Sequence, residues 1–177
     1  ADEQTGIFIT ETTKYFIIRN CHIYSTTGEH DGIKLTGVQN CLGVKDCLIE
    51  GCRWGISIGG GYNLVGIGEG CTVRNCKVGI EIYYGNGVRI SGCSVENCTF
   101  FGDGIRIHGY ASMNITIEDC VLKNCYYGVN ATGNIGNLSI TGCRIEGAQM
   151  GITNYIETPF GWEWGGSITN LLVNGCS

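Results

Sequence analysis

Cysteine is the residue type in this chain with the widest chemistry, because thiols bind soft metals, form disulfides and act as nucleophiles. The chain has 177 residues and 12 cysteines. Seven cysteines, here called anchors, recur at intervals of 22 to 33 residues, and four more follow an anchor by five residues. The anchor row is Cys21, Cys47, Cys71, Cys93, Cys120, Cys143 and Cys176, and the second row is Cys52, Cys76, Cys98 and Cys125.

Three uses of these rows remain open from the sequence: packing as small buried apolar residues, disulfides between the two rows, and metal binding. The anchor persists where the second row has Thr26 or Ala148 instead of cysteine, so it does not need a thiol partner. The Cys-x4-Cys spacing is not a zinc signature. We therefore expect a structural cysteine ladder, no metal and no other cofactor.

Acidic, basic and histidine side chains gather in two segments, "GEHDGIKL" and "GDGIRIHG". Such groups transfer protons in glycoside-cleaving enzymes, and carboxylates also bind calcium. The residues are Glu29, His30, Asp31 and Lys34 in the first segment and Asp103, Arg106 and His108 in the second.

These residues lie on a repeated pattern that predicts three short strands per unit. Aliphatic residues precede most anchors by five and three positions, as Leu42 and Val44 do, which is typical of a strand with one buried face. Asn, Asp or Gly comes just before the anchor and Ser, Gly or Asn four residues after it, and bends favour these types. A third strand follows in segments such as "DGIKL" and "VGIEI".

The third unit, "NLVGIGEGC", departs from this pattern. Gly66 and Gly68 occupy the two positions where aliphatic residues are expected before the anchor. One extra residue in a strand shifts its register relative to the neighbouring strand. We therefore expect a shifted register or a β-bulge in this unit.

Units of three short strands, with one proline and no helical periodicity, describe the coils of a parallel β-helix. The pattern resembles the right-handed parallel β-helix superfamily of pectate-lyase-like proteins, especially the short-coil repeats of the NosD-like and carbohydrate-binding or sugar-hydrolase group. The resemblance implies one all-β domain over residues 1–177, a β-solenoid of about seven coils without a capping helix. It implies no single function, because this superfamily includes lyases, hydrolases, epimerases, adhesins and structural rods.

Coil geometry argues against a joint catalytic site. Asp31 and Asp103 lie three coils apart, so about 14 Å separates them along the axis. The carboxylates of a glycoside hydrolase lie about 5 to 9.5 Å apart. Each aspartate also precedes a glycine, which is a common turn arrangement. We therefore predict turn residues and no catalytic residue, with catalysis and calcium binding as the alternatives.

A long insertion at residues 155–169 is rich in aromatic side chains and contains the one proline of the chain. It predicts a contact with a neighbouring subunit, a platform on which sugars stack, or a loop that packs on itself. The aromatic residues are Tyr155, Phe160, Trp162 and Trp164.

Four Asn-x-Ser/Thr sequences are possible glycosylation sites if the chain is secreted. The asparagines are Asn97, Asn114, Asn130 and Asn137. We expect the last three at outward strand or bend positions, and Asn97 at a less suitable bend between buried residues.

Composition excludes several partners. The net charge is −5 and the 11 Lys and Arg residues do not cluster, which disfavours nucleic acid and anionic lipid. No run of 18 apolar residues predicts a membrane span. Hydrophobic residues make up 43% of the chain and charged residues 15%, which is unlike a disordered protein.

The two ends of the sequence match parts of one repeat. The chain stops just after the anchor Cys176, and Gly6 begins a third strand near the other end. Open, complementary ends would stack head to tail into a filament, in which each copy adds about 34 Å. A piece of a longer β-helix would have the same ends.

The sequence therefore predicts a secreted, non-enzymatic structural protein that assembles with itself at the cell surface or outside the cell. The alternative is a carbohydrate-binding β-helix module, or one that degrades polysaccharides as a lyase or hydrolase.

Overall fold

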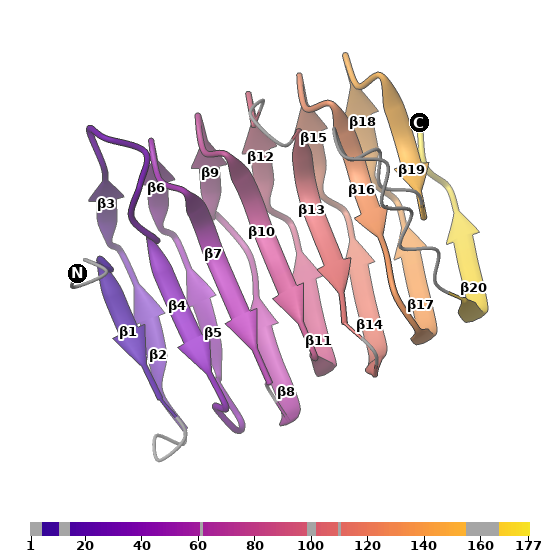
Figure 1. The fold of residues 1–177 in the computed structure, drawn as a ribbon, viewed down its shortest axis with the longest axis horizontal. Coiled ribbons are helices and arrows are strands. Elements are labelled where there is room, and N and C mark those ends of the chain that lie inside the picture. The colour runs from indigo at the N-terminus through magenta and orange to yellow at the C-terminus, as the bar shows by residue number, and fades with distance from the viewer. Residues whose placement is uncertain (1–4, 11–14, 61, 99–101, 110, 155–166) are drawn as a thin grey trace.

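A computed structural model of the chain describes residues 5–10, 15–60, 62–98, 102–109, 111–154 and 167–177. These residues form twenty β-strands that wind through three parallel sheets (Figure 1). Each strand belongs to a different sheet from the strand before it, and each sheet pairs strands that lie three apart in chain order. The predicted all-β parallel solenoid is confirmed. Among the described residues no helix is long and apolar enough to cross a membrane.

Two sheets have seven strands and the third has six, close to the predicted seven coils. Sheet 1 contains β1 (Ile7–Ile9), β4 (Ile33–Thr36), β7 (Trp54–Gly59), β10 (Val78–Tyr83), β13 (Asp103–His108), β16 (Tyr127–Ala131) and β19 (Met150–Thr153). Sheet 2 contains β2 (Ile17–Arg19), β5 (Gly43–Lys45), β8 (Tyr62–Ile67), β11 (Asn86–Ser91), β14 (Ser112–Glu118), β17 (Ile135–Thr141) and β20 (Ile168–Asn174). Sheet 3 contains β3 (His22–Tyr24), β6 (Leu48–Glu50), β9 (Thr72–Arg74), β12 (Ser94–Glu96), β15 (Val121–Lys123) and β18 (Arg144–Glu146).

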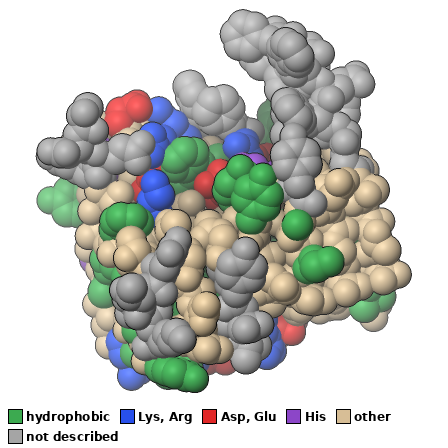
Figure 2. Space-filling model, turned by 60° about the horizontal axis from the view of Figure 1, so that its bottom comes forward, with side chains coloured by type: hydrophobic (Ala, Val, Ile, Leu, Met, Phe, Trp, Pro, Cys, Tyr) green, Lys and Arg blue, Asp and Glu red, His purple; other side chains and the backbone are tan. Residues whose placement is uncertain are grey.

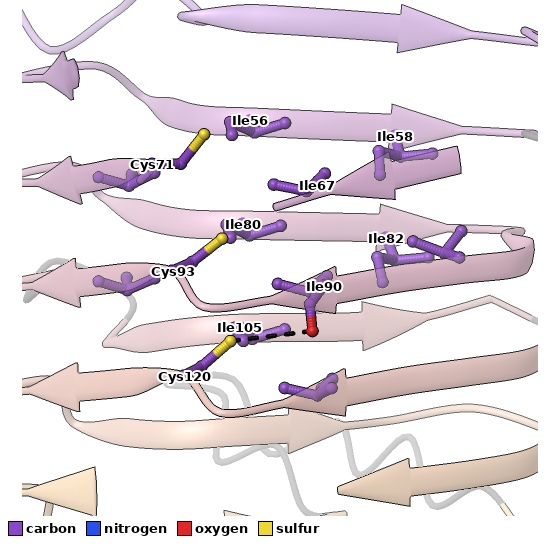
Figure 3. Close-up of a cluster of buried hydrophobic side chains, with 14 of the residues drawn as sticks. Ile56, Ile58, Ile67, Cys71, Ile80, Ile82, Ile90, Cys93, Ile105 and Cys120 are labelled. Atoms are coloured by element: carbon purple, nitrogen blue, oxygen red, sulfur yellow. Dashed lines mark hydrogen bonds between the residues drawn. The ribbon is translucent and has the colours of Figure 1, made fainter. Parts of the chain in front are cut away.

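Like residues stack on successive coils and fill the interior. Ile56, Ile80 and Ile105 are register partners on β7, β10 and β13, and all three are fully buried. Figure 3 shows this column of isoleucines beside the anchor cysteines. Because alternate residues of a strand point to opposite sides, the remaining residues of each strand face outward.

The predicted bends lie where the sequence placed them. All residues directly before the anchors have positive φ, and so do most residues four positions after them. Asn, Asp and Gly adopt this backbone conformation more readily than other residues do. The first set is Asn20, Asp46, Gly70, Gly92, Asp119, Gly142 and Gly175, and the second is Gly51, Asn75, Asn97, Asn124 and Gly147.

The third unit has the register shift that the sequence predicts. Val65 and Ile67 are buried, and Gly66 faces outward as the register partner of Arg89. The pairing of β8 with β11 is irregular near the start of both strands. The expectation that Leu42 is buried is wrong, because this residue is 61% exposed and its neighbour Cys41 is buried instead.

A row of glycines marks the corner between sheet 3 and sheet 1. A Cβ atom on Gly79 would collide with the Val95 side chain and with the carbonyl oxygen of Gly104 on the next coil. Glycine therefore lets the strands of sheet 1 lie close against the sheet 3 side chains of the next coil. The row is Gly6, Gly32, Gly55, Gly79, Gly104 and Gly128.

Candidate functional site

The outer face of sheet 1 carries a row of polar and charged residues. In each strand the aliphatic residues face the interior, and the residue between them faces outward. Strand pairing aligns these outward residues on six successive coils, and we call the set the polar row. It consists of Lys34, Ser57, Glu81, Arg106, Asn130 and Thr153.

Asp103 begins β13 and is fully buried beside this row. The Nε–H of Arg106 donates to the Asp103 carboxylate, and Nδ2 of Asn130 donates to its Oδ1 atom at 3.1 Å. Burial raises the pKa of the Asp103 carboxyl, while the Arg106 guanidinium opposes that rise. Among the described residues, the buried Oδ1 atom of Asn130 has no hydrogen-bond partner.

Glu81 is the buried carboxylate in the middle of the polar row. Its Oε2 atom accepts a hydrogen bond from Ser57 Oγ at 3.0 Å, and its Oε1 atom lies 3.0 Å from His108 Nε2. The rings of His108 and Tyr83 pack with their centroids 4.7 Å apart. Tyr83 is exposed and His108 is partly exposed, so a buried carboxylate orients an accessible imidazole beside an accessible aromatic ring.

Asp31 forms a second buried ion-pair cluster at the equivalent position three coils earlier. Its Oδ1 atom accepts from Nε of Arg53 at 3.0 Å, and its Oδ2 atom lies 3.7 Å from Nζ of Lys34. The Arg53 guanidinium also stacks on the Trp54 ring at 4.1 Å. The sequences Asp-Gly-Ile-Lys and Asp-Gly-Ile-Arg therefore build the same arrangement, in which a buried aspartate pairs with the basic residue three positions later.

This arrangement presents oriented hydrogen-bond donors. Ser57 donates to one Glu81 oxygen and His108 lies against the other, so one carboxylate holds both groups. The described residues contain no cluster of three or more His, Cys, Asp and Glu side chains that could hold a metal ion. Figure 2 shows acidic, basic and histidine side chains beside a large hydrophobic group in the upper part of that view.

The sequence named part of this site and missed its centre. Asp103 pairs with Arg106, while His108 contacts Glu81 of the preceding coil, which is also the register partner of Arg106. Both aspartates are buried and paired with the basic residue three positions later, a role that the prediction of turn residues did not include. The signal for Glu81 was its place in "VGIEI", where a charged residue interrupts an aliphatic strand.

The other acidic candidate lies apart from this centre. Glu29 is exposed and accepts from Nζ of Lys77 at 2.8 Å. His30 contributes its backbone carbonyl, which accepts from the backbone N–H of Arg53.

The cysteines pack at the bends as free thiols. All twelve are free, and all but Cys21 and Cys176 are buried. Each anchor from Cys93 to Cys143 lies near the carbonyl oxygen two residues earlier, and for Cys47 this distance is 3.1 Å. Burial raises the pKa of the Cys47 thiol to about 11, so this thiol stays protonated at neutral pH. Figure 3 shows neighbouring anchors side by side against the isoleucines, namely Cys71, Cys93 and Cys120.

The possible glycosylation sites differ in accessibility. Asn130 is 1% exposed, so the expected outward acceptor is buried at this position. Asn114 and Asn137 are exposed members of a side-chain ladder, in which each Nδ2 atom donates to the Oδ1 atom of the asparagine on the preceding coil. Asn97 accepts such a bond from Asn124 at 3.1 Å. The aromatic residues Tyr155, Phe160, Trp162 and Trp164 lie outside the described residues.

Comparison with known proteins identifies a family for this chain but no individual relative. Searches of curated proteins and of solved structures find no match. A family model described as a right-handed beta helix region matches residues 5–158. This range includes both ion-pair clusters and nearly all coils described above. The chain therefore belongs to the right-handed β-helix family.

Proposed function

We propose that this protein binds carbohydrate through the polar row on the outer face of sheet 1. The observation that carries the proposal is the pair of buried carboxylates, Glu81 and Asp103, which hold accessible groups of His108 and Arg106 in place beside Tyr83. Sugar hydroxyls need fixed donors and acceptors, and an aromatic ring packs against the apolar face of a sugar.

The charges of the site favour a glycan without charged groups. Asp31 neutralises Lys34 and Arg53 in part, and Asp103 neutralises Arg106. With Glu81, three carboxylates balance three permanent cations, so no excess positive charge is left for uronic acids. Pre-oriented groups also lose less conformational entropy when a ligand binds.

Binding to soluble neutral and acidic polysaccharides, measured by calorimetry on the full chain, tests this proposal. We expect His108→Ala and Tyr83→Ala each to weaken binding about tenfold or more, since each removes about 1.4 kcal/mol or more of contact energy. Tyr24→Ala is the matched control, because Tyr24 is an exposed tyrosine on sheet 3, away from the polar row. Binding that survives both site variants would place the glycan elsewhere.

The same mixtures separate binding from cleavage. New reducing ends or unsaturated products would identify a hydrolase or lyase, in which Glu81 and His108 are the groups positioned to move a proton. An intact polymer after binding identifies a carbohydrate-binding module. We also propose that the protein is located outside the cell or at its surface, where a glycan ligand would be accessible.

A second candidate function is a structural one, in which copies stack end to end into a filament. The observation that favours it is the open edge of β20, where Leu171, Leu172 and Val173 are each about half exposed. Leu171 and Val173 continue the inward rows of sheet 2, since they are register partners of Leu138 and Ile140. A further parallel coil, from another copy or from the same polypeptide, would bury them.

Electron microscopy and light scattering test the stacking. Fibres with an axial repeat of about 34 Å per copy are expected if the ends join. Leu171→Lys should prevent assembly, because it places a charge in a row that stacking buries. Leu172→Lys is the control, since Leu172 faces outward as the partner of Ser139. Single particles at high concentration would exclude this candidate.

A further inference from the structure

Two glycines leave a depression on the outer face of sheet 2. β5 and β8 place Gly43 and Gly66 at the outward position that Ile17, Arg89 and Thr116 occupy on other coils. Gly66 is therefore partly exposed between side chains on both sides, while Gly43 is buried beneath the Lys45 side chain. Glycine inside a strand often marks a place where a ligand approaches the backbone closely.

The backbone does not require glycine at position 66. Gly66 does not have positive φ, and a Cβ atom built on it would meet its nearest neighbour, Cα of Gly43, at 3.9 Å. This is an ordinary van der Waals contact. Gly43 differs, because its φ of 149° favours glycine. The strand thus omits a side chain at Gly66 that the fold has room to hold.

The depression is large enough for a ring-sized ligand. Two adjoining recesses of about 330 Å³ and about 230 Å³ share Leu42, Gly66 and Arg89 as lining residues. We call them together the glycine recess. Its larger part is also lined by Tyr15 and Val65, and its smaller part by Lys45, Glu69 and Ser91. Ligand sites in proteins begin at about 300 Å³.

The apolar side of the glycine recess is unusually exposed. Leu42 is 61% exposed and Tyr15 is 69% exposed. Tyr15 also has a φ of 55°, a left-handed conformation that is rare for a bulky residue. Residues in such strained conformations cluster at active sites and ligand-binding sites. The ring of Tyr15 and the side chain of Leu42 therefore offer an apolar contact surface.

The polar side of the recess carries donors and acceptors with balanced charge. Nζ of Lys45 lies 3.8 Å from Glu69, and the Arg89 guanidinium is paired with Glu118. Ser91 adds a hydroxyl group. A site for an anion would present unpaired cations, whereas this edge mixes N–H donors with carboxylate and hydroxyl acceptors. Its chemistry fits a neutral hydroxylated ligand.

We propose that the glycine recess binds a single neutral sugar ring, with the apolar face of the ring against Leu42 and Tyr15 and its hydroxyl edge toward Arg89, Glu69 and Ser91. The site lies on sheet 2, whereas the polar row lies on sheet 1, so it does not depend on the function proposed above.

Nuclear magnetic resonance titration of the ¹⁵N-labelled full chain with methyl glucopyranoside, methyl galactopyranoside and methyl mannopyranoside tests the proposal. At least one of them should shift the amide signals of Gly43, Gly66 and Gly68 saturably. Gly66→Leu fills the recess and should weaken binding of the pyranoside at least tenfold. Gly66→Ala should have an affinity between those of Gly66→Leu and the native protein. Ser139→Leu adds the same side chain to the same outward row outside the recess and should leave binding unchanged.

Three outcomes overturn the proposal. The first is the absence of saturable shifts at the glycine amides with all three pyranosides. The second is that Gly66→Leu binds the pyranosides as tightly as the native protein. The dispersed amide signals of this variant would show that it is folded. The third is tighter binding of glucuronic acid than of the neutral sugars, which would contradict the ligand class. His108→Ala should shift the glycine amide signals of the recess as the native protein does. Failure of the polar row as a binding site is therefore distinguished from failure of the glycine recess.

Discussion

The Oε1 atom of Glu81 lies 3.0 Å from Nε2 of His108, although 27 residues separate them in the chain. The two residues belong to neighbouring coils, where the pairing of β10 with β13 aligns Tyr83 with His108. One turn of the solenoid thus converts a long separation into a hydrogen-bonded contact. The contact of His108 with Glu81 in the polar row therefore depends on the pairing of two coils.

Replacing Asp103 with Asn should change how stability depends on pH. Burial raises the pKa of this carboxyl above its usual value of 3.8. At pH values between 3.8 and the raised pKa, the folded state therefore binds more protons than the unfolded state. The free energy of unfolding of the native protein, relative to Asp103→Asn, should therefore fall as pH rises through this window. Urea unfolding in steps from about pH 4 to about pH 7 measures the difference.

Glu50→Gln is the control of opposite sign. Hydrogen bonds from His22 and Arg74 lower the pKa of the Glu50 carboxyl below its usual 4.5. Its stabilising contribution is present above that value and is lost as pH falls through the folded pKa. If both variants follow the native pH profile, the titration of neither carboxyl is coupled to folding.

Substitution of Gly79 by Ala should destabilise the fold by about 1 to 3 kcal/mol, because the added methyl group collides with Val95 and with the next coil. Gly66→Ala is the matched variant on another face. Its methyl group has room, and alanine restricts the unfolded chain, so stability should rise by about 0.5 to 1 kcal/mol. Urea midpoints compare the two, and equal effects would contradict the close-packed corner.

The cysteines should remain free thiols in the isolated protein. All twelve thiols are unpaired in the structure, and ten of them are buried away from oxidants in solution. Mass spectrometry after alkylation in denaturant without reductant should find twelve modified cysteines. In the native protein Cys21 and Cys176 should react first, because they alone are partly exposed. Fewer than twelve modified thiols would show bridging within the ladder.

Asn137 should stabilise the fold both through its backbone conformation and through the hydrogen bonds of its side chain in the asparagine ladder. Its φ is 53°, its Nδ2 atom donates to Asn114 at 2.8 Å, and its Oδ1 atom accepts from Asn170 at 2.8 Å. Asn137→Gly keeps the backbone and removes the ladder bonds, which costs about 1 kcal/mol. Asn137→Ala adds the left-handed penalty of about 1 to 2 kcal/mol. Denaturation of both variants separates the two effects, and equal stabilities would contradict the backbone argument.

Local sequence was sufficient for the bends and strands of this protein. Asn20, Asp46 and Gly70 stand before their anchors as residues that accept positive φ, and the chain bends at each of them. Aliphatic alternation also located the inward faces, with Ile115 and Ile117 both buried. These features follow from φ and from strand geometry, which depend on neighbours in the chain.

Local sequence was insufficient where coils interact. Leu42 looked like a core residue because of its spacing, but the backbone at Gly43 turns Cys41 inward instead. Asp103 looked like a turn residue, and its burial depends on Arg106 and on Asn130 of the next coil. Glu81 was missed because its partners lie one coil before and one coil after it. Such contacts require the register, which the repeat lengths alone do not fix.

The chain segment between Cys21 and Gly32 is three residues longer than the segment between Cys47 and Gly55, yet both glycines stand in one stacked row. The same extra length precedes Gly104. This corner therefore accepts inserted sequence while the strands beyond it keep their register. New recognition segments could be grafted there, one coil at a time, so the protein is a candidate framework for directed evolution in which diversity is confined to a single edge.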